Sequence, residues 1–266
     1  MRIGTVPYLN AKPLIDWFHS EQCDADAKIV QAVPSELALM LDRGDVDVAL
    51  VSVFDLFVHS RLRLIPGISI SADGPVKSVR LFSKVPLAQI RSVALDTSSL
   101  TSTALLRILL AERHGISPRW HPHAPDLDAM LASHDAALLI GDLRLFQEAA
   151  AHVTDLGAEW KALTGLPFVY AAWLARPEAP LGSLEQVLHR AKEWGVARLE
   201  SLSETWAARM CLPLDRVRDY FLNVMQYDLG PAHLKALEQF HRKCVAHGLI
   251  GAAGSRADGG THVCLP

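Results

Sequence analysis

Short apolar runs alternate with amphipathic segments along the first half of the 266-residue chain. The runs VDVALVSV at 46–53 and AALLIG at 136–141 are continuous rather than alternating, which is typical of strands covered on both faces. The segment PSELALMLDRG at 34–44 is predicted to be a helix, because Pro34 stands in its first turn and Gly44 follows its end. Together these features predict an α/β fold with largely parallel strands.

A second series of strands and helices begins after Pro86, and the C-terminal third of the chain is helical. The segment PFVYAAWLAR at 167–176 is rich in aromatic and β-branched residues, which favours a strand. The remaining strands are predicted at 2–8, 28–33, 62–73, 76–84, 91–96 and 119–125, and the remaining helices at 98–115, 126–134, 142–150, 183–200, 201–210, 213–230 and 231–250.

The composition argues against two classes of partner. The formal net charge is −3, and no cluster of lysine and arginine is interleaved with aromatic residues, so we do not expect nucleic-acid binding. The N-terminus lacks a basic segment followed by an apolar run, and no apolar stretch approaches the ~20 residues that span a bilayer. We therefore expect a cytoplasmic protein without membrane association.

Sequence motifs for the common cofactors are missing. The chain contains no G-x-G-x-x-G after a strand, no P-loop, no H-E-x-x-H and no G-x-S-x-G, which disfavours dinucleotide and NTP chemistry. His121 and His123 form an H-x-H pair without a carboxylate or thiol at a ligand spacing, and the four cysteines form no C-x-x-C. We predict neither a metal ion nor an organic cofactor.

Polar residues follow several predicted strands at their carboxyl ends, where open α/β sheets bind ligands. The segment DTSSLTS at 96–102 joins a strand to a helix and supplies five hydroxyls. One hydroxyl suffices as a helix cap worth about 1 kcal/mol, so the others favour a bound carboxylate or phosphate. The candidate ligand-binding residues are Tyr8, Asn10, Ser52, Ser83, Ser99, Thr101, Ser102 and Asp142.

Two of these residues have a competing structural interpretation. Asn10 lies in the turn VPYLNAKPL at 6–14, where it either caps a helix or contacts a ligand. Asp142 follows Gly141 at the end of a strand, and its position favours a helix cap. The residues alone leave both alternatives open.

Six segments of the chain together carry a family resemblance. They are VPYLNAKPL, GDVDVALVSVFDL, SVRLFS, LDTSSLTSTALLRILL, LLIGDLRL and DLGAEWKALTGLPFVYAAW. In combination they resemble the chorismate dehydratases of the futalosine route to menaquinone. The segments cover roughly the first two thirds of the chain, whereas the C-terminal helices match only in general character. One departure is Leu100, where many members of that family have arginine.

The resemblance implies a two-lobed type II periplasmic-binding-protein-like fold with a ligand cleft between the lobes. Residues 1–85 and the helical part 173–266 would form the first lobe, and residues 86–172 the second. Two crossover strands, SVRLFSKV and YAAWLAR, would join the lobes.

The resemblance also implies an activity, the loss of water from chorismate to give 3-[(1-carboxyvinyl)oxy]benzoate. Such a carbon–oxygen lyase needs no cofactor. Asn10 would act at the reacting carbons, the other candidate residues would bind substrate, and the substrate's own side-chain carboxylate would accept the proton. The alternative is a non-catalytic cytoplasmic binding protein for a small carboxylate or other anion. The oligomeric state is left open.

Overall fold

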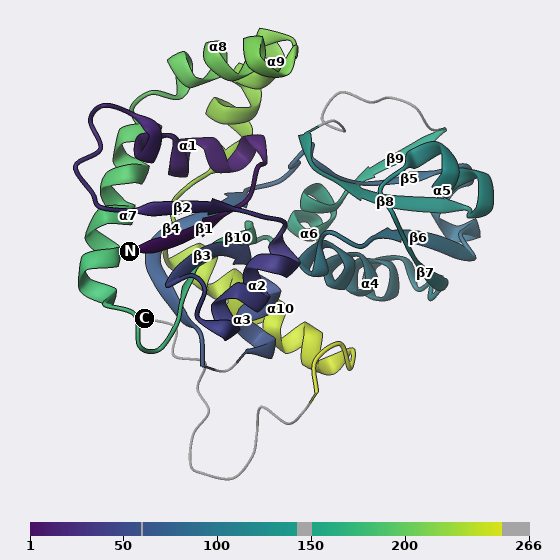
Figure 1. The fold of residues 1–266 in the computed structure, drawn as a ribbon. Helices are drawn as coiled ribbons and strands as arrows, with labels where there is room; N and C mark the ends of the chain where they lie inside the picture. The colour runs from purple at the N-terminus through teal and green to yellow at the C-terminus, as the bar shows by residue number, and fades with distance from the viewer. Residues whose placement is uncertain (60, 143–150, 252–266) are drawn as a thin grey trace. The chain divides into compact units, whose positions relative to one another are not determined.

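The computed structural model describes residues 1–59, 61–142 and 151–251 and divides the chain into two compact units (Figure 1). Unit 1 combines Met1–Ser71 with the chain from Val169 onward, and unit 2 is Ala72–Phe168. The predicted helix at 142–150 falls almost wholly outside the described residues.

Unit 1 is built on a six-stranded sheet with the strand order β11-β4-β10-β3-β1-β2. The first strand pairs in parallel with β2 and β3, whereas β10 runs antiparallel to β3. All residues of β3 are buried, as its continuous apolar sequence predicts. The strands are β1 (Arg2–Thr5), β2 (Lys28–Gln31), β3 (Val48–Ser52), β4 (Arg63–Ala72), β10 (Phe168–Ala175) and β11 (Met225–Gln226).

The helices of unit 1 cover both faces of this sheet, with α1 on one side and α2 and α3 on the other (Figure 1). Pro34 begins α2, and Gly44 ends it in the left-handed conformation with φ 78°, as the sequence predicts. The α-helices are α1 (Lys12–Ile15), α2 (Pro34–Arg43), α3 (Val53–Val58), α7 (Leu181–Val196), α8 (Leu199–Met210), α9 (Leu214–Asp219) and α10 (Pro231–Ala246), with short 3₁₀ turns η1 (Leu9–Ala11) and η2 (Asp16–His19) and a π-helix η5 (Tyr220–Val224).

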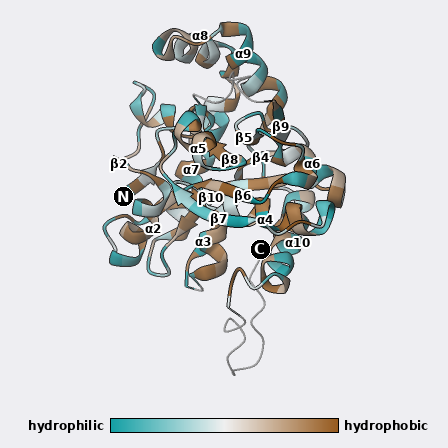
Figure 2. Ribbon diagram, turned by 90° about the vertical axis from the view of Figure 1, so that its right-hand side faces the viewer, coloured by the Kyte–Doolittle hydropathy of each residue, from teal (hydrophilic) through white to brown (hydrophobic). Residues whose placement is uncertain are grey.

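Unit 2 contains a five-stranded sheet with the strand order β7-β6-β8-β5-β9. β6 is parallel to β7 and β8, but β5 is antiparallel to both of its neighbours. Figure 2 shows the hydrophilic edge strand β7, whose His121 is exposed. The elements are β5 (Val79–Ser83), β6 (Ser92–Asp96), β7 (Arg119–His123), β8 (Ala136–Ile140), β9 (His152–Asp155), α4 (Leu100–His114), α5 (Leu127–Ser133), α6 (Leu156–Thr164) and a 3₁₀ turn η3 (Leu87–Gln89).

The boundaries between the units differ from the predicted lobe boundaries. The prediction places the second lobe at 86–172 and treats SVRLFSKV as a crossover strand. In the structure, this segment forms β5 and pairs with β8 and β9, so it belongs to the sheet of unit 2. The chain therefore leaves unit 1 at the end of β4, and it returns at the start of β10.

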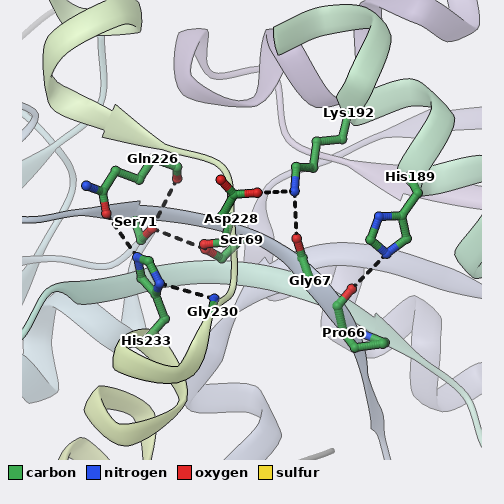
Figure 3. Close-up of polar contacts among 10 residues, drawn as sticks. All are labelled: Pro66, Gly67, Ser69, Ser71, His189, Lys192, Gln226, Asp228, Gly230 and His233. Carbon is green, nitrogen blue, oxygen red and sulfur yellow. Dashed lines mark hydrogen bonds and ion pairs between the residues drawn. The ribbon is translucent and has the colours of Figure 1, made fainter.

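The predicted helix at 213–230 is interrupted, because its second half pairs with β4. Ser69 Oγ donates to Asp228 O at 2.7 Å and Ser71 Oγ to Gln226 O at 3.1 Å (Figure 3). From α7, Lys192 Nζ donates to Gly67 O at 2.8 Å. Backbone pairing with a sheet edge thus replaces the helix at Met225, and α7 and the β11 segment both hold the end of β4.

A backbone contact fixes α1 against α7. A Cβ on Gly195 would lie 1.8 Å from Pro13 O, so the two helices approach as closely as they do only because residue 195 has no side chain. Gly182, in the first turn of the same helix, has open space around the corresponding position. The position of α1 therefore depends on a glycine at 195.

Replacing Gly195 with alanine should destabilise the protein by about 3 kcal/mol or more, because backbone atoms of α1 must move. Thermal denaturation should show a melting temperature lower by about 6 °C or more. Gly182→Ala is the matched control in the same helix. It should leave stability unchanged or raise it by less than about 1 kcal/mol. Equal effects of the two substitutions would contradict the packing argument.

The Asp55 carboxyl in the first turn of α3 is only 2% exposed. Burial raises the pKa of this group to about 6, an effect that Asp42 strengthens and His59 opposes. Since its ordinary pKa is 3.8, the folded state loses stability as the pH rises from about 4 through 6. The two pKa values differ by about 2 units, which corresponds to at most about 3 kcal/mol.

Asp55→Asn should therefore make the protein more stable than the parent at pH 8, by up to about 3 kcal/mol. The difference should vanish below pH 4, where Asp55 is protonated in both the folded and the unfolded chain. Chemical denaturation of both proteins at pH 8 and at a pH below 4 measures this difference in stability. Asp215→Asn, at an exposed first-turn position of α9, is the control and should show no such pH dependence.

Candidate functional site

Asn10 lies in η1, the 3₁₀ turn that follows β1 and leads directly into α1. The residues at the N-cap positions of η1 and α1 are Tyr8 and Ala11, and neither helix has a side-chain cap. Asn10 is therefore not the cap that the sequence left possible. Its Oδ1 atom is buried and has no hydrogen-bond partner among the described residues.

A buried amide oxygen without a hydrogen-bond donor destabilises the folded state by about 1–3 kcal/mol. Pro13 in the first turn of α1 and the contact with Gly195 hold this part of the chain in place. A polar atom kept buried, rigid and unpartnered is the arrangement expected of a group that pairs with a ligand.

Two further buried polar atoms, in Thr5 and Trp173, face the side of the unit 1 sheet on which α1 lies. Gly4 faces Leu37 of α2, so Thr5 faces the opposite side of the sheet, where α1 lies. Trp173 of β10 faces that side too, since its partner Leu50 follows Ala49, which pairs with Gly4. Thr5 Oγ1 and Trp173 Nε1 have no hydrogen-bond partner among the described residues.

Ser52, at the carboxyl end of β3, is 7% exposed and serves as the N-cap of α3. Its Oγ atom accepts a hydrogen bond from Phe54 N at 3.2 Å. Tyr8 follows the carboxyl end of β1, and Ser52 is the last residue of β3, which is parallel to β1. Ligands of open α/β sheets bind at such strand ends.

In unit 2, the hydroxyl segment at the start of α4 is ordered by its own side chains. Ser99 caps the helix by accepting from Ser102 N at 3.2 Å, and its Oγ donates to Ser102 Oγ at 2.8 Å. Thr101 and Ser102 are 1% and 2% exposed. The helix that they begin is 15 residues long, so its N-terminus favours a negative charge.

Asp96, which is not among the predicted ligand-binding residues, organises this segment. Its carboxylate, 2% exposed, accepts from Ser98 N at 2.9 Å and from Ile140 N at 3.3 Å. It also accepts from Ser98 Oγ. Asp96 thus joins the end of β6 to the end of β8. Asp142, two residues after Ile140 in the sequence, is 9% exposed. An aspartate two residues before a serine is the sequence signal of such a turn.

Ser83 does not belong with these residues, which corrects the predicted site. It pairs with Ala136, the first residue of β8, whereas Ile140 at the far end of β8 pairs with Val79. β5 runs antiparallel to β8, so Ser83 and Asp142 lie at opposite ends of the strand pair. The Ser83 hydroxyl is also engaged, since it donates to Val85 O at 2.6 Å and to Asp135 O at 3.2 Å.

The described parts of the chain contain neither a cluster of metal-ligating residues nor a helix that could span a membrane. No group of three or more His, Cys, Asp or Glu residues there could hold a metal ion. The His121 ring instead packs on the His134 ring, with centroids 4.7 Å apart. None of the described helices is long and apolar enough to cross a membrane.

Comparison with known families and proteins gives concordant results. A family model described as menaquinone biosynthesis matches residues 1–246. The chain is 35% identical over 228 residues to the chorismate dehydratase of Thermus thermophilus, covering 78% of this chain and 82% of that protein. It is 25% identical over 252 residues to the chorismate dehydratase of Campylobacter jejuni, covering 92% and 98%.

Solved structures with low sequence identity share the fold. The Archaeoglobus fulgidus protein AF1704 superposes with a TM-score of 0.74 at 16% identity and covers 94% of this chain and 98% of that one. The periplasmic aliphatic sulphonate binding protein SsuA from Escherichia coli gives a TM-score of 0.63 at 17% identity, covering 94% and 93%. These similarities confirm the predicted periplasmic-binding-protein-like fold.

Proposed function

This chain belongs to the menaquinone biosynthesis family, and we propose that it is a chorismate dehydratase. It would convert chorismate to 3-[(1-carboxyvinyl)oxy]benzoate and water, as a carbon–oxygen lyase of the cytoplasm on the futalosine route. The similarity to two chorismate dehydratases over most of the chain supports this assignment.

This elimination depends more on holding the substrate in a reactive conformation than on a strong base. The ring hydroxyl departs, the ring carbon that carries the ether loses its proton, and the proton and hydroxide leave together as water. The ring becomes aromatic, which makes the reaction strongly downhill. A protein that holds the dianion in a reactive conformation can therefore supply much of the acceleration.

The observation that carries the proposal is the buried, unpartnered amide oxygen of Asn10. An asparagine side chain offers one acceptor oxygen and two N–H donors, and it stays neutral at any working pH. We assign it to the reacting carbons, where it orients the departing hydroxyl. The side-chain carboxylate of chorismate is then the proton acceptor, because Asn10 cannot be one.

Substrate carboxylates would bind at the hydroxyl segment of unit 2. Ser99, Thr101 and Ser102 supply hydroxyls at the N-terminus of α4, where backbone N–H groups also favour an anion. Leu100 is 49% exposed and carries no charge, so the anion depends on those hydroxyls and N–H groups. Tyr8, Ser52 and Asp142 complete the proposed binding residues.

The direct test is to incubate the purified protein with chorismate and to follow the ultraviolet spectrum. Formation of an aromatic chromophore, with a product lighter than chorismate by one water in the mass spectrum, would support the proposal. Tight binding of chorismate without spectral change would overturn it and favour a non-catalytic binding protein for a small anion.

Asn10→Ala should lower kcat for chorismate by about 10²–10³-fold, because the group that orients the reacting atoms is lost. The KM should change by only a few fold, since the carboxylates bind elsewhere. Steady-state kinetics with both parameters measures this. Asn223→Ala, which removes an exposed amide bonded to Asp219, is the matched control and should keep full activity. Unchanged turnover of Asn10→Ala would exclude its proposed role.

Asp142→Asn should retain measurable turnover at saturating chorismate, because the substrate rather than this carboxylate accepts the proton. The comparison of kcat with the chorismate dissociation constant separates catalysis from binding. An Asp142→Asn protein that still binds chorismate but has lost all turnover would identify Asp142 as the base and refute the substrate-assisted step.

A further inference from the structure

A cavity of about 380 Å³ lies within unit 1 and shares no residue with the proposed active site. It is open to solvent, and it is lined by α1 and η2 on one side and by the C-terminal end of α7 and α8 on the other. Gln31, the last residue of β2, also contributes to its wall. The cavity is therefore built from segments far apart in the sequence.

The lining of this cavity is cationic in a chain whose net charge is −3. Lys12, Arg198 and Arg209 contribute three positive charges, and Asp16 is the only carboxylate among the lining residues. Counting histidine as neutral, the lining carries a formal charge of +2. Such a concentration of charge in a concave site attracts anions.

Two indole rings form its aromatic walls, and cations stack on both. The ammonium of Lys12 lies 4.2 Å from the Trp206 ring centroid, and Arg209 Cζ lies 5.2 Å from the same centroid. Arg198 Cζ lies 4.7 Å from the centroid of Trp194. Lys12 is 5% exposed, so its charge is held within the protein.

Hydrogen bonds fix the orientation of both rings. Trp206 Nε1 donates to Asp16 Oδ2 at 2.5 Å, and Trp194 Nε1 donates to Gln22 Oε1 at 2.6 Å. Asp16, the one carboxylate among the lining residues, therefore already accepts a hydrogen bond from Trp206.

The arginines of the cavity form no ion pair with a carboxylate among the described residues. Burial raises the pKa of the Asp16 carboxyl, and nearby Arg209 is among the groups that oppose this rise. Within the described residues, neither Arg198 nor Arg209 makes an ion pair, and Arg198 donates only to Trp194 O and Gln22 Oε1. By contrast, Arg190 on α7 also stacks on an indole, that of Trp17, but is paired with Asp24 at 2.8 Å. Guanidinium groups beside flat aromatic walls are suited to bind a planar carboxylate.

We propose that this cavity is a second binding site, specific for a small aromatic carboxylate. Its ring would pack beside the indoles and the cations that stack on them, and its carboxylate would pair with Arg198 and Arg209. The proposal does not depend on the proposed dehydratase activity.

The test uses the full chain labelled with 5-fluorotryptophan, whose six tryptophans give fluorine NMR signals. Trp194→Phe and Trp206→Phe assign the two relevant signals. Benzoate is the probe, cyclohexanecarboxylate has the same charge without an aromatic ring, and benzamide has the ring without the charge. Benzoate should shift the Trp194 and Trp206 signals in a saturable manner. Benzamide should not, and cyclohexanecarboxylate should bind at least about fivefold more weakly.

The double variant Arg198→Gln/Arg209→Gln should bind benzoate at least about tenfold more weakly, because it loses both charge-assisted contacts. Arg190→Gln is the matched control on α7 and should bind like the parent. Both variants should keep the chorismate turnover of the parent, so a failure of the proposed function would show separately in that assay.

Three outcomes would overturn the proposal. One is the absence of saturable shifts at Trp194 and Trp206, and another is benzamide binding as well as benzoate. The third is unchanged benzoate binding in the double arginine variant. Cyclohexanecarboxylate binding equal to that of benzoate would refute the aromatic specificity.

Discussion

The close approach of Pro13 and Gly195 is the constraint on which the proposed chemistry of unit 1 depends. At this point the backbone of α1 lies against α7 with no side chain between them. α1 is only four residues long, so it cannot hold its position by its own hydrogen bonds. Packing against the 16-residue α7 supplies the rigidity that the short helix lacks. Asn10 lies three residues before Pro13, so the same packing holds its backbone in place.

Local signals in the sequence predicted the elements that local chemistry determines. Pro34 and Gly44 mark the ends of α2, and the apolar run at 46–53 becomes the buried β3, because caps and burial act over a few residues. Ser99 at the start of α4 is a cap for the same reason. The fold class, the ends of α2 and the buried strand β3 could therefore be predicted from the sequence.

Features that depend on pairing between distant segments could not be predicted in this way. The antiparallel direction of β5 places Ser83 away from Asp142, and nothing within the strand reveals its direction. The segment after η5 has a helical sequence, yet it pairs with β4 through Ser69 and Ser71. In the cavity of unit 1, Lys12 contacts Trp206, which is far away in the sequence, and no sequence motif predicts this contact.

A strongly raised pKa is a common mark of a catalytic carboxyl group, and by that mark alone Asp55 would be chosen instead of Asn10. Asp55 has a carboxyl pKa raised to about 6, and a buried carboxylate of that kind is an ordinary candidate for a general base. However, the charged groups that act on it are Asp42 of α2 and His59 just after α3, and both helices lie on the face of the sheet opposite α1.

The raised pKa of Asp55 thus reflects its burial on the face of the sheet that α2 and α3 cover, whereas Asn10 leads into α1 on the other face. In the proposed elimination, which is driven by aromatisation, a neutral and rigidly held amide would be sufficient because the substrate carries its own carboxylate. A protein base of pKa near 6 would add a pH dependence that such a mechanism does not require. We therefore base the proposed reaction on the geometry of η1 and α1 and not on the carboxyl group with the most strongly raised pKa.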